Sequence, residues 1–366
     1  MNRGDVLTKN FTYVGRAGIL RRSPTSTERA TSSARSLVFH SNTRWSESVG
    51  EQRMTRAFTH VPVLEAEVLA AFRSVAPGVI IDATLGGAGH ASALLGMRDD
   101  VAVLGIDRDP IARQAATERL APFGDRARVV AGTFSNLMAF VENESKWIAG
   151  REIVGVFADL GVSSPQLDDQ ERGFSFRADA PLDMRMDGSS GITAAEYIAT
   201  VELDELRTLL REHGEDKFAH AIAKSILARQ PQTTSELVTA VEVVVPMAAR
   251  RRGNVATRAF QALRVAINEE VRELDEVLSG AIQVLAVGGV LAVISYHSGE
   301  DRVTKEFLKH QATGGCTCPV ILGCVCGAVS TMTVRKGGAI VASEDELARN
   351  PRARSARMRI GVKVAS

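Results

Sequence analysis

The chain has 366 residues, of which 45% are hydrophobic and 24% charged, and its formal net charge is +1. This balance is typical of a globular protein with one large domain carrying an insertion, or with two domains. A nearly neutral chain has no overall attraction to nucleic acid, so any basic surface must be local. No apolar run reaches the roughly 20 residues that span a bilayer, so we expect no membrane partner.

The N-terminal residues 1–53 are rich in Arg, Ser and Thr and poor in acids. Such a segment cannot bury enough apolar surface to offset its ordering entropy, so we expect a disordered extension. Transit peptides of organelles share this composition. Three interpretations therefore stay open: a bacterial cytoplasmic protein with an extension, a start at Met54, and a mitochondrial protein with a transit peptide.

From Thr59 onward, short apolar runs alternate with helical patterns. Asp109 and Pro110 mark one helix start, because the first can cap the helix and the second has no N–H to leave unsatisfied. Strands that alternate with helices predict an α/β fold with a parallel sheet. The strands are predicted at residues 79–82, 101–106, 128–131 and 153–159.

The alternation stops after Asp159, and residues 170–252 carry mainly helical patterns. We predict that an α/β domain, residues 54–169 and 253–366, is interrupted by an inserted helical domain, residues 170–252, which recognises the substrate and covers the carboxyl edge of the sheet. The other predicted elements are a helix at 256–278, a strand at 290–295, a helix at 302–310 and an antiparallel edge pair at 331–335 and 358–364.

The segment Ile80–His90 has the pattern of a buried strand, a glycine-rich turn and a helix start, and the next strand ends at Asp107. This layout is typical of a nucleotide-type cofactor site at the carboxyl edge of a parallel sheet. The glycines would let the backbone approach a ligand, and Asp107 would accept hydrogen bonds from ribose hydroxyls. The spacing alone also fits a tight turn followed by an acid at a strand end.

Asp159 lies at a second strand end, and open α/β sheets bind ligands at such ends. A turn-rich segment begins at Asp159 and extends to Gln166. With its continuation to Phe176 and the run Pro181–Asp187, this segment resembles the signature of the MraW (RsmH) family. Further blocks agree in the family's order and extend the resemblance from Thr59 to the C-terminus: His60–Leu64, Ile106–Pro110, Arg258–Arg264, Ser295–Ser298 and Asn350–Ala356.

The resemblance implies a Rossmann-like sheet that binds S-adenosylmethionine, with an inserted helical domain. It also implies methyl transfer to the exocyclic N4 of a cytosine in the decoding centre of bacterial 16S ribosomal RNA, with the small ribosomal subunit as partner. Neither the oligomeric state nor the form of the substrate, free RNA or assembled subunit, follows from it.

Carried over by position, the resemblance assigns the methyl donor to residues at several strand ends. The chain departs from the family at Ala88, where glycine is usual, and at Ala91, where serine is frequent. If residue 88 has a positive φ, alanine there costs about 1 kcal/mol. The implied donor contacts are Ala88, Gly89 and His90 over the methionine and ribose, Asp107 at the ribose, Phe134 beside the adenine, and Asp159 and Gln166 closing the pocket.

The methyl of a sulfonium needs neither a metal nor a covalent nucleophile, whereas the N4 lone pair of cytosine is delocalised into its ring. Acceptors on the N4 hydrogens and in-line placement would both help. We expect Asp159 or Ser164 to accept from N4, and Phe174 or Phe176 to stack on the extruded base. Core packing is the other explanation for the two phenylalanines, and His297 would contact the substrate or satisfy a loop.

Two arginine clusters, at residues 250–252 and between 352 and 359, could contact the RNA backbone or form a solvated basic face. We favour RNA contact, with Arg352 and Arg354 as the candidates. The cysteines form one compact cluster, for which zinc binding and reduced thiols in a loop both remain open, because the Cys-x-Cys spacing is tighter than usual. Its members are Cys316, Cys318, Cys324 and Cys326.

Two other functions fit parts of the sequence. A nicotinamide-dependent dehydrogenase would use the same strand–glycine–acid layout, although the run from Gly86 lacks the full G-x-G-x-x-G spacing. An RNA-binding assembly factor without catalysis would not need the residues that suit a cofactor pocket, and these are present.

Overall fold

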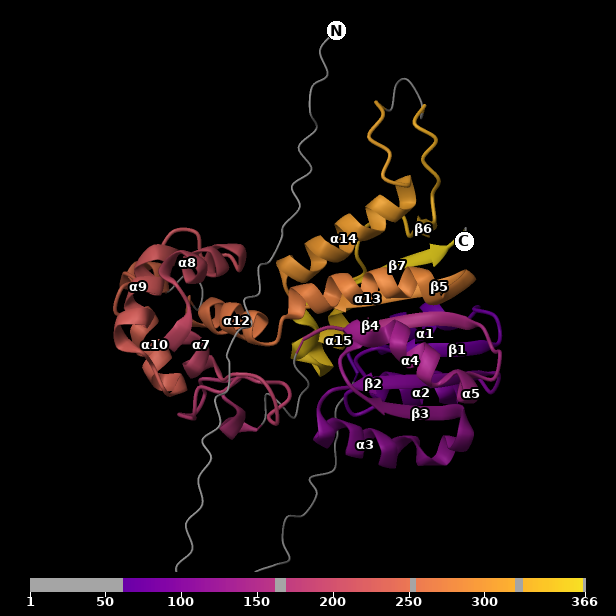
Figure 1. The fold of residues 1–366 in the computed structure, drawn as a ribbon, viewed down its shortest axis with the longest axis horizontal. Helices are drawn as coiled ribbons and strands as arrows, with labels where there is room; N and C mark the ends of the chain where they lie inside the picture. Colours follow the sequence, from indigo (N-terminus) through magenta and orange to yellow (C-terminus); the bar gives the residue numbers. More distant parts are fainter. Residues whose placement is uncertain (1–61, 162–168, 251–254, 320–324, 365–366) are drawn as a thin grey trace, which may run out of the picture. The chain divides into compact units, whose positions relative to one another are not determined.

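A computed structural model of the protein describes residues 62–161, 169–250, 255–319 and 325–364 (Figure 1). Residues Thr55–Ser366 form one compact unit. The predicted N-terminal extension, Ser164, Gln166 and Cys324 lie outside the described residues. Among the described helices, none combines the length and apolar character needed to cross a bilayer.

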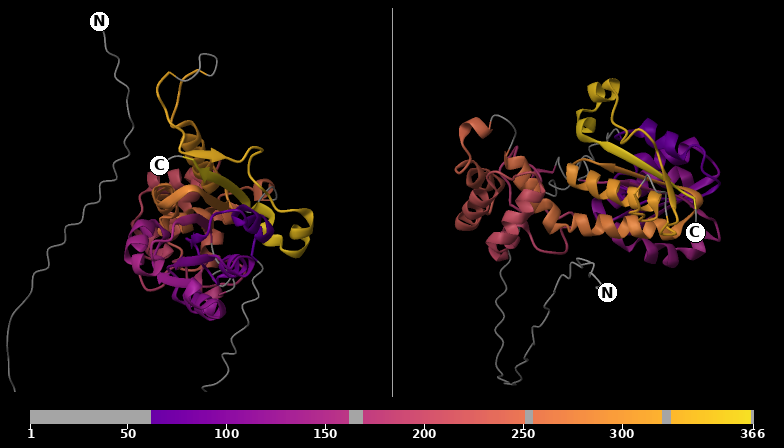
Figure 2. Two further views of the ribbon diagram at one scale, coloured as in Figure 1. Left: turned by 90° about the vertical axis from the view of Figure 1, so that its right-hand side faces the viewer. Right: turned by 90° about the horizontal axis from the view of Figure 1, so that it is seen from above.

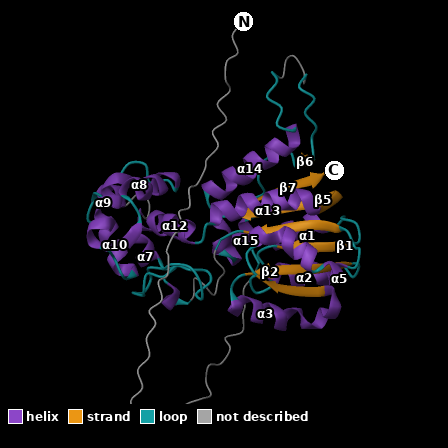
Figure 3. Cartoon of the chain, in the orientation of Figure 1, coloured by secondary structure: helices purple, strands orange, loops and turns teal. Residues whose placement is uncertain are grey.

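A seven-stranded sheet, with the order β3-β2-β1-β4-β5-β7-β6, forms the centre of the α/β part (Figure 3). The first five strands in this order pair in parallel, while β7 is antiparallel to both of its neighbours. The α/β prediction and the antiparallel edge pair are therefore confirmed, although β5 begins before the predicted strand. The strands are β1 Gly78–Asp82, β2 Val101–Asp107, β3 Ala127–Ala131, β4 Ile153–Asp159, β5 Leu285–Ser295, β6 Met332–Val334 and β7 Arg357–Lys363.

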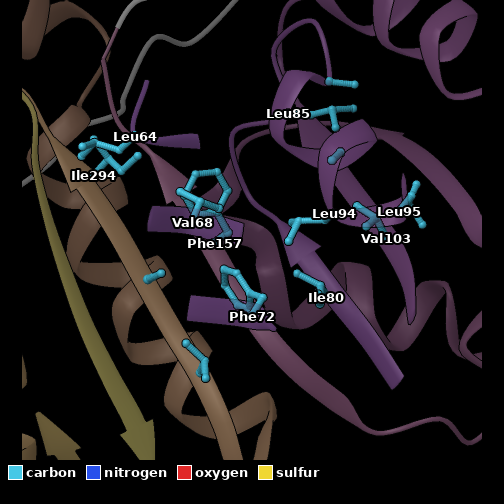
Figure 4. Close-up of a cluster of buried hydrophobic side chains, with 14 of the residues drawn as sticks. Leu64, Val68, Phe72, Ile80, Leu85, Leu94, Leu95, Val103, Phe157 and Ile294 are labelled. Atoms are coloured by element: carbon cyan, nitrogen blue, oxygen red, sulfur yellow. The ribbon is translucent and has the colours of Figure 1, made fainter. Parts of the chain in front are cut away.

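Alternate residues of the parallel strands enter two different cores, because successive side chains of a strand point to opposite faces. Ile80 packs with Val68 and Phe72 of α1 on one face (Figure 4), whereas Ile81 packs on the other face with α13 residues such as Leu278. Helices thus cover both faces of the sheet. They are α1 Glu65–Phe72, α2 Gly89–Met97, α3 Pro110–Leu120, α4 Leu137–Asn143, α5 Ser145–Ile148, α13 Glu270–Val284, α14 Ser298–Thr313 and α15 Glu344–Arg349.

The described residues from 170 to 267, called the helical segment below, are mainly helical and have a hydrophobic core of their own, which includes Leu206, Ile222 and Leu237. Thr193 begins the first of these helices with a capping box to Glu196. The helices, part of the chain coloured from magenta to orange in Figure 2, are α7 Ala194–Thr200, α8 Leu203–Glu212, α9 Ala219–Arg229, α10 Thr234–Glu242, α11 Met247–Arg250 and α12 Val255–Ile267.

The single helix predicted at residues 256–278 is wrong, because the structure divides it into α12 and α13. Glu269 takes a left-handed conformation with φ 50° between them. Asn268 stabilises the break: its side chain accepts from the Met186 N–H at 2.8 Å and donates to the Met184 carbonyl at 2.9 Å. The break lets α12 pack in the helical segment while α13 packs on the sheet.

The helix predicted at residues 302–310 is longer than expected and begins at Ser298. His297 caps it, since its Nδ1 accepts from the Glu300 N–H at 3.3 Å while the Glu300 carboxylate accepts from the His297 N–H. This is a capping box with histidine where serine or threonine is usual.

Candidate active site

Four neighbouring strands bring the predicted cofactor residues to one edge of the sheet. The loop Gly86–His90 follows β1, Asp107 ends β2, Phe134 follows β3 and Asp159 ends β4. The strand order reverses between β1 and β4, and open α/β sheets bind ligands at such a switch point.

The loop after β1 has a strained backbone. Gly86 has φ +51° and Ala88 has φ 57°, so the condition stated above for residue 88 is met. Ala88 therefore occupies a conformation that costs alanine about 1 kcal/mol, and its buried methyl group packs in the core. At Gly89 a Cβ would lie 2.7 Å from the Pro62 ring, so only glycine fits there.

Asp107 holds this loop in place. One of its carboxylate oxygens accepts from the Gly86 N–H at 2.7 Å, and the other accepts from the Asp109 N–H at 2.8 Å. Burial raises the pKa of Asp107 despite these two bonds, and the charge of Asp109 adds to the rise. Because a carboxylate offers about four acceptor positions, both oxygens can still accept from a ligand hydroxyl.

Asp159 is fixed by the elements on both sides of β4. Its N–H donates to the Thr84 hydroxyl at 2.6 Å, and its Oδ1 accepts from the Tyr296 hydroxyl at 2.8 Å. Burial raises the pKa of Tyr296 well above its usual value, and the Asp159 charge adds to this, so the phenol stays protonated and donating. The His90 Nε2 lies 3.6 Å from the second Asp159 oxygen.

His90 and Asp82 form the buried floor of this edge. Within the described residues, neither ring nitrogen of His90 has a hydrogen-bond partner, although the ring is buried against Phe157 at 4.8 Å. The pKa of Asp82 is raised to about 7, because the effect of burial exceeds that of the His90 charge and the Thr84 N–H, which both lower it. Buried polar groups normally make hydrogen bonds, so the His90 ring, whose Nε2 has a 3.6 Å contact with Asp159 but no hydrogen bond within the described residues, can hydrogen-bond a ligand.

A cavity of about 420 Å³ lies between the sheet edge and the helical segment. Its volume is within the roughly 300–1,000 Å³ of ligand pockets. Four aromatic rings line it, from Phe174, Phe176, Phe260 and Tyr296, and the charged or basic side chains in its wall are Arg264, His297 and Arg352. It is therefore suited to a planar, polar-edged group.

The two predicted stacking residues lie in this wall but also pack against protein. Phe176 is 36% exposed, with its ring 5.1 Å from that of Phe260. Phe174 packs on the core of the helical segment, under the Arg172 guanidinium. Core packing, the second of the two explanations, is therefore present at both residues, while stacking on a base stays a prediction.

His297 is at once a helix cap and a cavity residue. Its Nε2 lies 3.1 Å from the buried Glu300 carboxylate. Burial alone would raise the pKa of Glu300, but the His297 hydrogen bond and charge and the nearby Arg264 hold it below its usual value. Arg264 itself makes two 2.8 Å bonds to Glu270, so the wall is an ordered network of charges.

Arg172 ties the helical segment to the sheet edge. It donates at 2.6 Å to Asp109, the residue that caps α3, and at 2.7 Å to the Met186 carbonyl. The Asp109 side chain is 4% exposed. A buried ion pair of this kind fixes the position of the segment that carries Phe174.

The predicted basic surface is only partly present. Arg354 and Arg357 are exposed, and Arg352 is an exposed residue that also borders the cavity. Arg359 is not part of this surface, because it donates two hydrogen bonds to Asp301, at 2.7 and 3.0 Å. Asp301 lies in the first turn of α14, so this pair links α14 to β7.

Some site residues were missed at the level of sequence. Tyr296 follows a buried strand, which was the one available signal, but its bond to Asp159 spans 137 positions. Arg264 lies within the block Arg258–Arg264 that resembles the family, but no role was predicted for it. The pairing of Arg172 with Asp109 could not be inferred, because both residues have ordinary local explanations.

The residues at the strand ends fit S-adenosylmethionine. The backbone leaves room beside Gly86, the Asp107 oxygens have acceptor capacity, and the His90 nitrogens make no hydrogen bond within the described part of the chain. A doubly wound sheet with this edge and an adjoining cavity is the architecture of an enzyme that binds a nucleotide-type cofactor, the class to which S-adenosylmethionine belongs.

Comparison with known proteins gives the family. The MraW methylase family profile matches residues 57–364. The Ribosomal RNA small subunit methyltransferase H of Geotalea daltonii is 45% identical, over 84% of this chain and 99% of its own length. That of Heliobacterium modesticaldum is 42% identical over the same shares. The chain belongs to the MraW methylase family, as the sequence resemblance predicted, and the dehydrogenase alternative is set aside.

Among solved structures, an rRNA methylase from Streptococcus thermophilus aligns with 82% of this chain and 94% of its own, at 11% identity and a TM-score of 0.36.

Proposed function

We propose that this protein methylates the exocyclic N4 of a cytosine in the decoding centre of 16S ribosomal RNA. The RNA is part of the small ribosomal subunit, and the reaction takes place in the bacterial cytoplasm. The names of its relatives support ribosomal RNA of the small subunit as substrate. The observation that carries the proposal is the pairing of Asp159 with Tyr296, since Tyr296 lines the aromatic cavity and orients an acceptor carboxylate beside it.

S-Adenosylmethionine supplies an electrophilic methyl group. In this proposal, Asp107 accepts from the ribose hydroxyls, Phe134 borders the adenine, and the loop from Ala88 to His90 covers the methionine part. The Arg108 guanidinium lies 5.8 Å from the Phe134 ring centroid and fixes that ring. Gln166, outside the described residues, keeps its predicted role of closing the pocket.

The cytosine enters the cavity, and the surrounding aromatic rings stack on it. Asp159 accepts a hydrogen bond from N4, which directs the nitrogen lone pair away from the carboxylate. Transfer of the methyl group would leave one proton to be removed from N4, and the Asp159 carboxylate that accepts the N4 hydrogen bond would be placed to take it. Positioning of this kind can lower a barrier by several kcal/mol. Ser164 remains the alternative acceptor.

Binding of the RNA itself is assigned to the exposed arginines and to the helical segment, which contains residues 170–252, the predicted substrate-recognition domain. Arg352 and Arg354 lie at the cavity border or close to it in sequence, where they can contact the phosphates that flank an extruded base. His297 also lies in the cavity wall, but both of its ring nitrogens face Glu300, so its predicted contact with the substrate would be made by the face of the ring.

The decisive experiment is methyl transfer to small ribosomal subunits prepared from cells that lack this modification. Tritium from labelled S-adenosylmethionine should enter the 16S RNA, and nucleoside mass spectrometry should find N4-methylcytidine at one position. Protein-free RNA, tested in parallel, distinguishes the two forms of substrate. Label in another nucleoside, or at ring carbon 5, would refute the proposal.

A further inference from the structure

The cysteine segment between α14 and β6 is not used by the methyl-transfer chemistry. Its described parts leave the end of α14 and return to β6 (Figure 1). The base of the segment is well held: the Gly315 N–H donates to the His310 carbonyl at 3.0 Å, and the Thr331 hydroxyl bonds the Gln311 side chain at 2.6 Å. Beyond this base, Val325 and Val329 are 85% and 68% exposed, so little apolar burial stabilises the segment.

Three sulfur atoms converge in this segment. The Sγ atoms of Cys316, Cys318 and Cys326 all lie within 4.8 Å of one another. Around a tetrahedral zinc with Zn–S bonds of about 2.3 Å, neighbouring sulfurs are about 3.8 Å apart, so a small contraction would complete the geometry. The three residues form no disulfide with one another.

The backbone also supports the convergence of the three sulfur atoms. Two glycines, Gly315 and Gly327, have φ +72° on either side of the cluster, and these turns direct both arms toward the same point.

We propose that Cys316, Cys318 and Cys326 bind one thiophilic divalent cation, Zn²⁺, which fixes the segment between α14 and β6. Metal binding stabilises the folded form of this segment, because it crosslinks two arms that bury little apolar surface. Cys324 lies outside the described residues, so the structure defines three ligands and leaves the fourth position to another donor.

The test is metal analysis of the full-length protein, purified without metal-affinity chromatography. Plasma mass spectrometry should find about one zinc per chain in the wild type. Cys318→Ser and Cys326→Ser should each lose most of it, while Thr317→Ala, an exposed change between two of the ligands, should keep it. The apo protein should bind one Co²⁺ with a thiolate-to-cobalt charge-transfer band that Zn²⁺ abolishes.

Three results would overturn the site. These are cobalt uptake without the charge-transfer band, iron with inorganic sulfide in place of zinc, and cysteines paired as disulfides in a thiol count under denaturing, metal-free conditions. If a serine variant fails to fold, the cobalt spectrum of the wild type still decides the question. Methyl transfer is not the readout, so the metal site and the proposed reaction can fail independently.

Discussion

Replacing Tyr296 by phenylalanine removes one hydroxyl and leaves the ring in the cavity wall. The lost bond is the 2.8 Å donation to the Asp159 carboxylate. A hydrogen bond to a charged group is worth about 1.5–3 kcal/mol. If all of it serves to orient Asp159 in the transition state, kcat should fall roughly 10- to 150-fold. Stability should change by about 1 kcal/mol or less, since the ring still packs.

Tyr197→Phe is the matched control, because it also removes a hydroxyl that donates to a carboxylate, that of Glu205 at 3.1 Å, within the helical segment. Single-turnover methyl transfer should separate the two variants, with S-adenosylmethionine affinity measured by calorimetry. Tyr296→Phe should lose rate with little change in cofactor affinity, and Tyr197→Phe should lose neither. A Tyr296→Phe rate within twofold of wild type would refute the orienting role.

Four further substitutions test other parts of the protein. Asp159→Ala should abolish methyl transfer while the protein stays folded by circular dichroism, and near-normal turnover would remove Asp159 from the mechanism. Arg354→Ala should weaken RNA binding and lower the slope of log K against log salt by about 0.7–0.9, and an unchanged slope would mean that Arg354 belongs to a solvated face. Arg359→Ala should instead cost on the order of 2–3 kcal/mol of stability by leaving Asp301 unpaired. An unaltered melting temperature of the Arg359→Ala variant would contradict this. Asp82 has a folded pKa of about 7 against an ordinary value of 3.8, so the native state holds a proton that the unfolded state releases, and stability falls as pH rises between these values. Relative to Asp82→Asn, the free energy of unfolding of the wild type should fall by on the order of 2–3 kcal/mol from pH 5 to pH 8 in urea titrations. Parallel pH profiles of the two proteins would refute the raised pKa of Asp82.

The sequence predicted the parallel sheet and most strand positions, because strands buried on both faces are nearly continuous apolar runs. The start of α3 could also be predicted from the sequence, since Asp109 caps this helix and Pro110 is its first residue. The break between α12 and α13 was not predictable, since it depends on Asn268 bonding the backbone of residues 184 and 186, more than 80 positions away.

The candidate site divides in the same way. The sequence by itself determined which strand ends carry Asp107 and Asp159, because parallel strands end at one edge of a sheet. Only the tertiary structure decided that Tyr296 holds Asp159, that Arg172 ties the helical segment to Asp109, and that Arg359 pairs with Asp301 rather than facing solvent. These contacts join segments far apart in the chain, and local propensity, which acts over a few residues, has no means of specifying them.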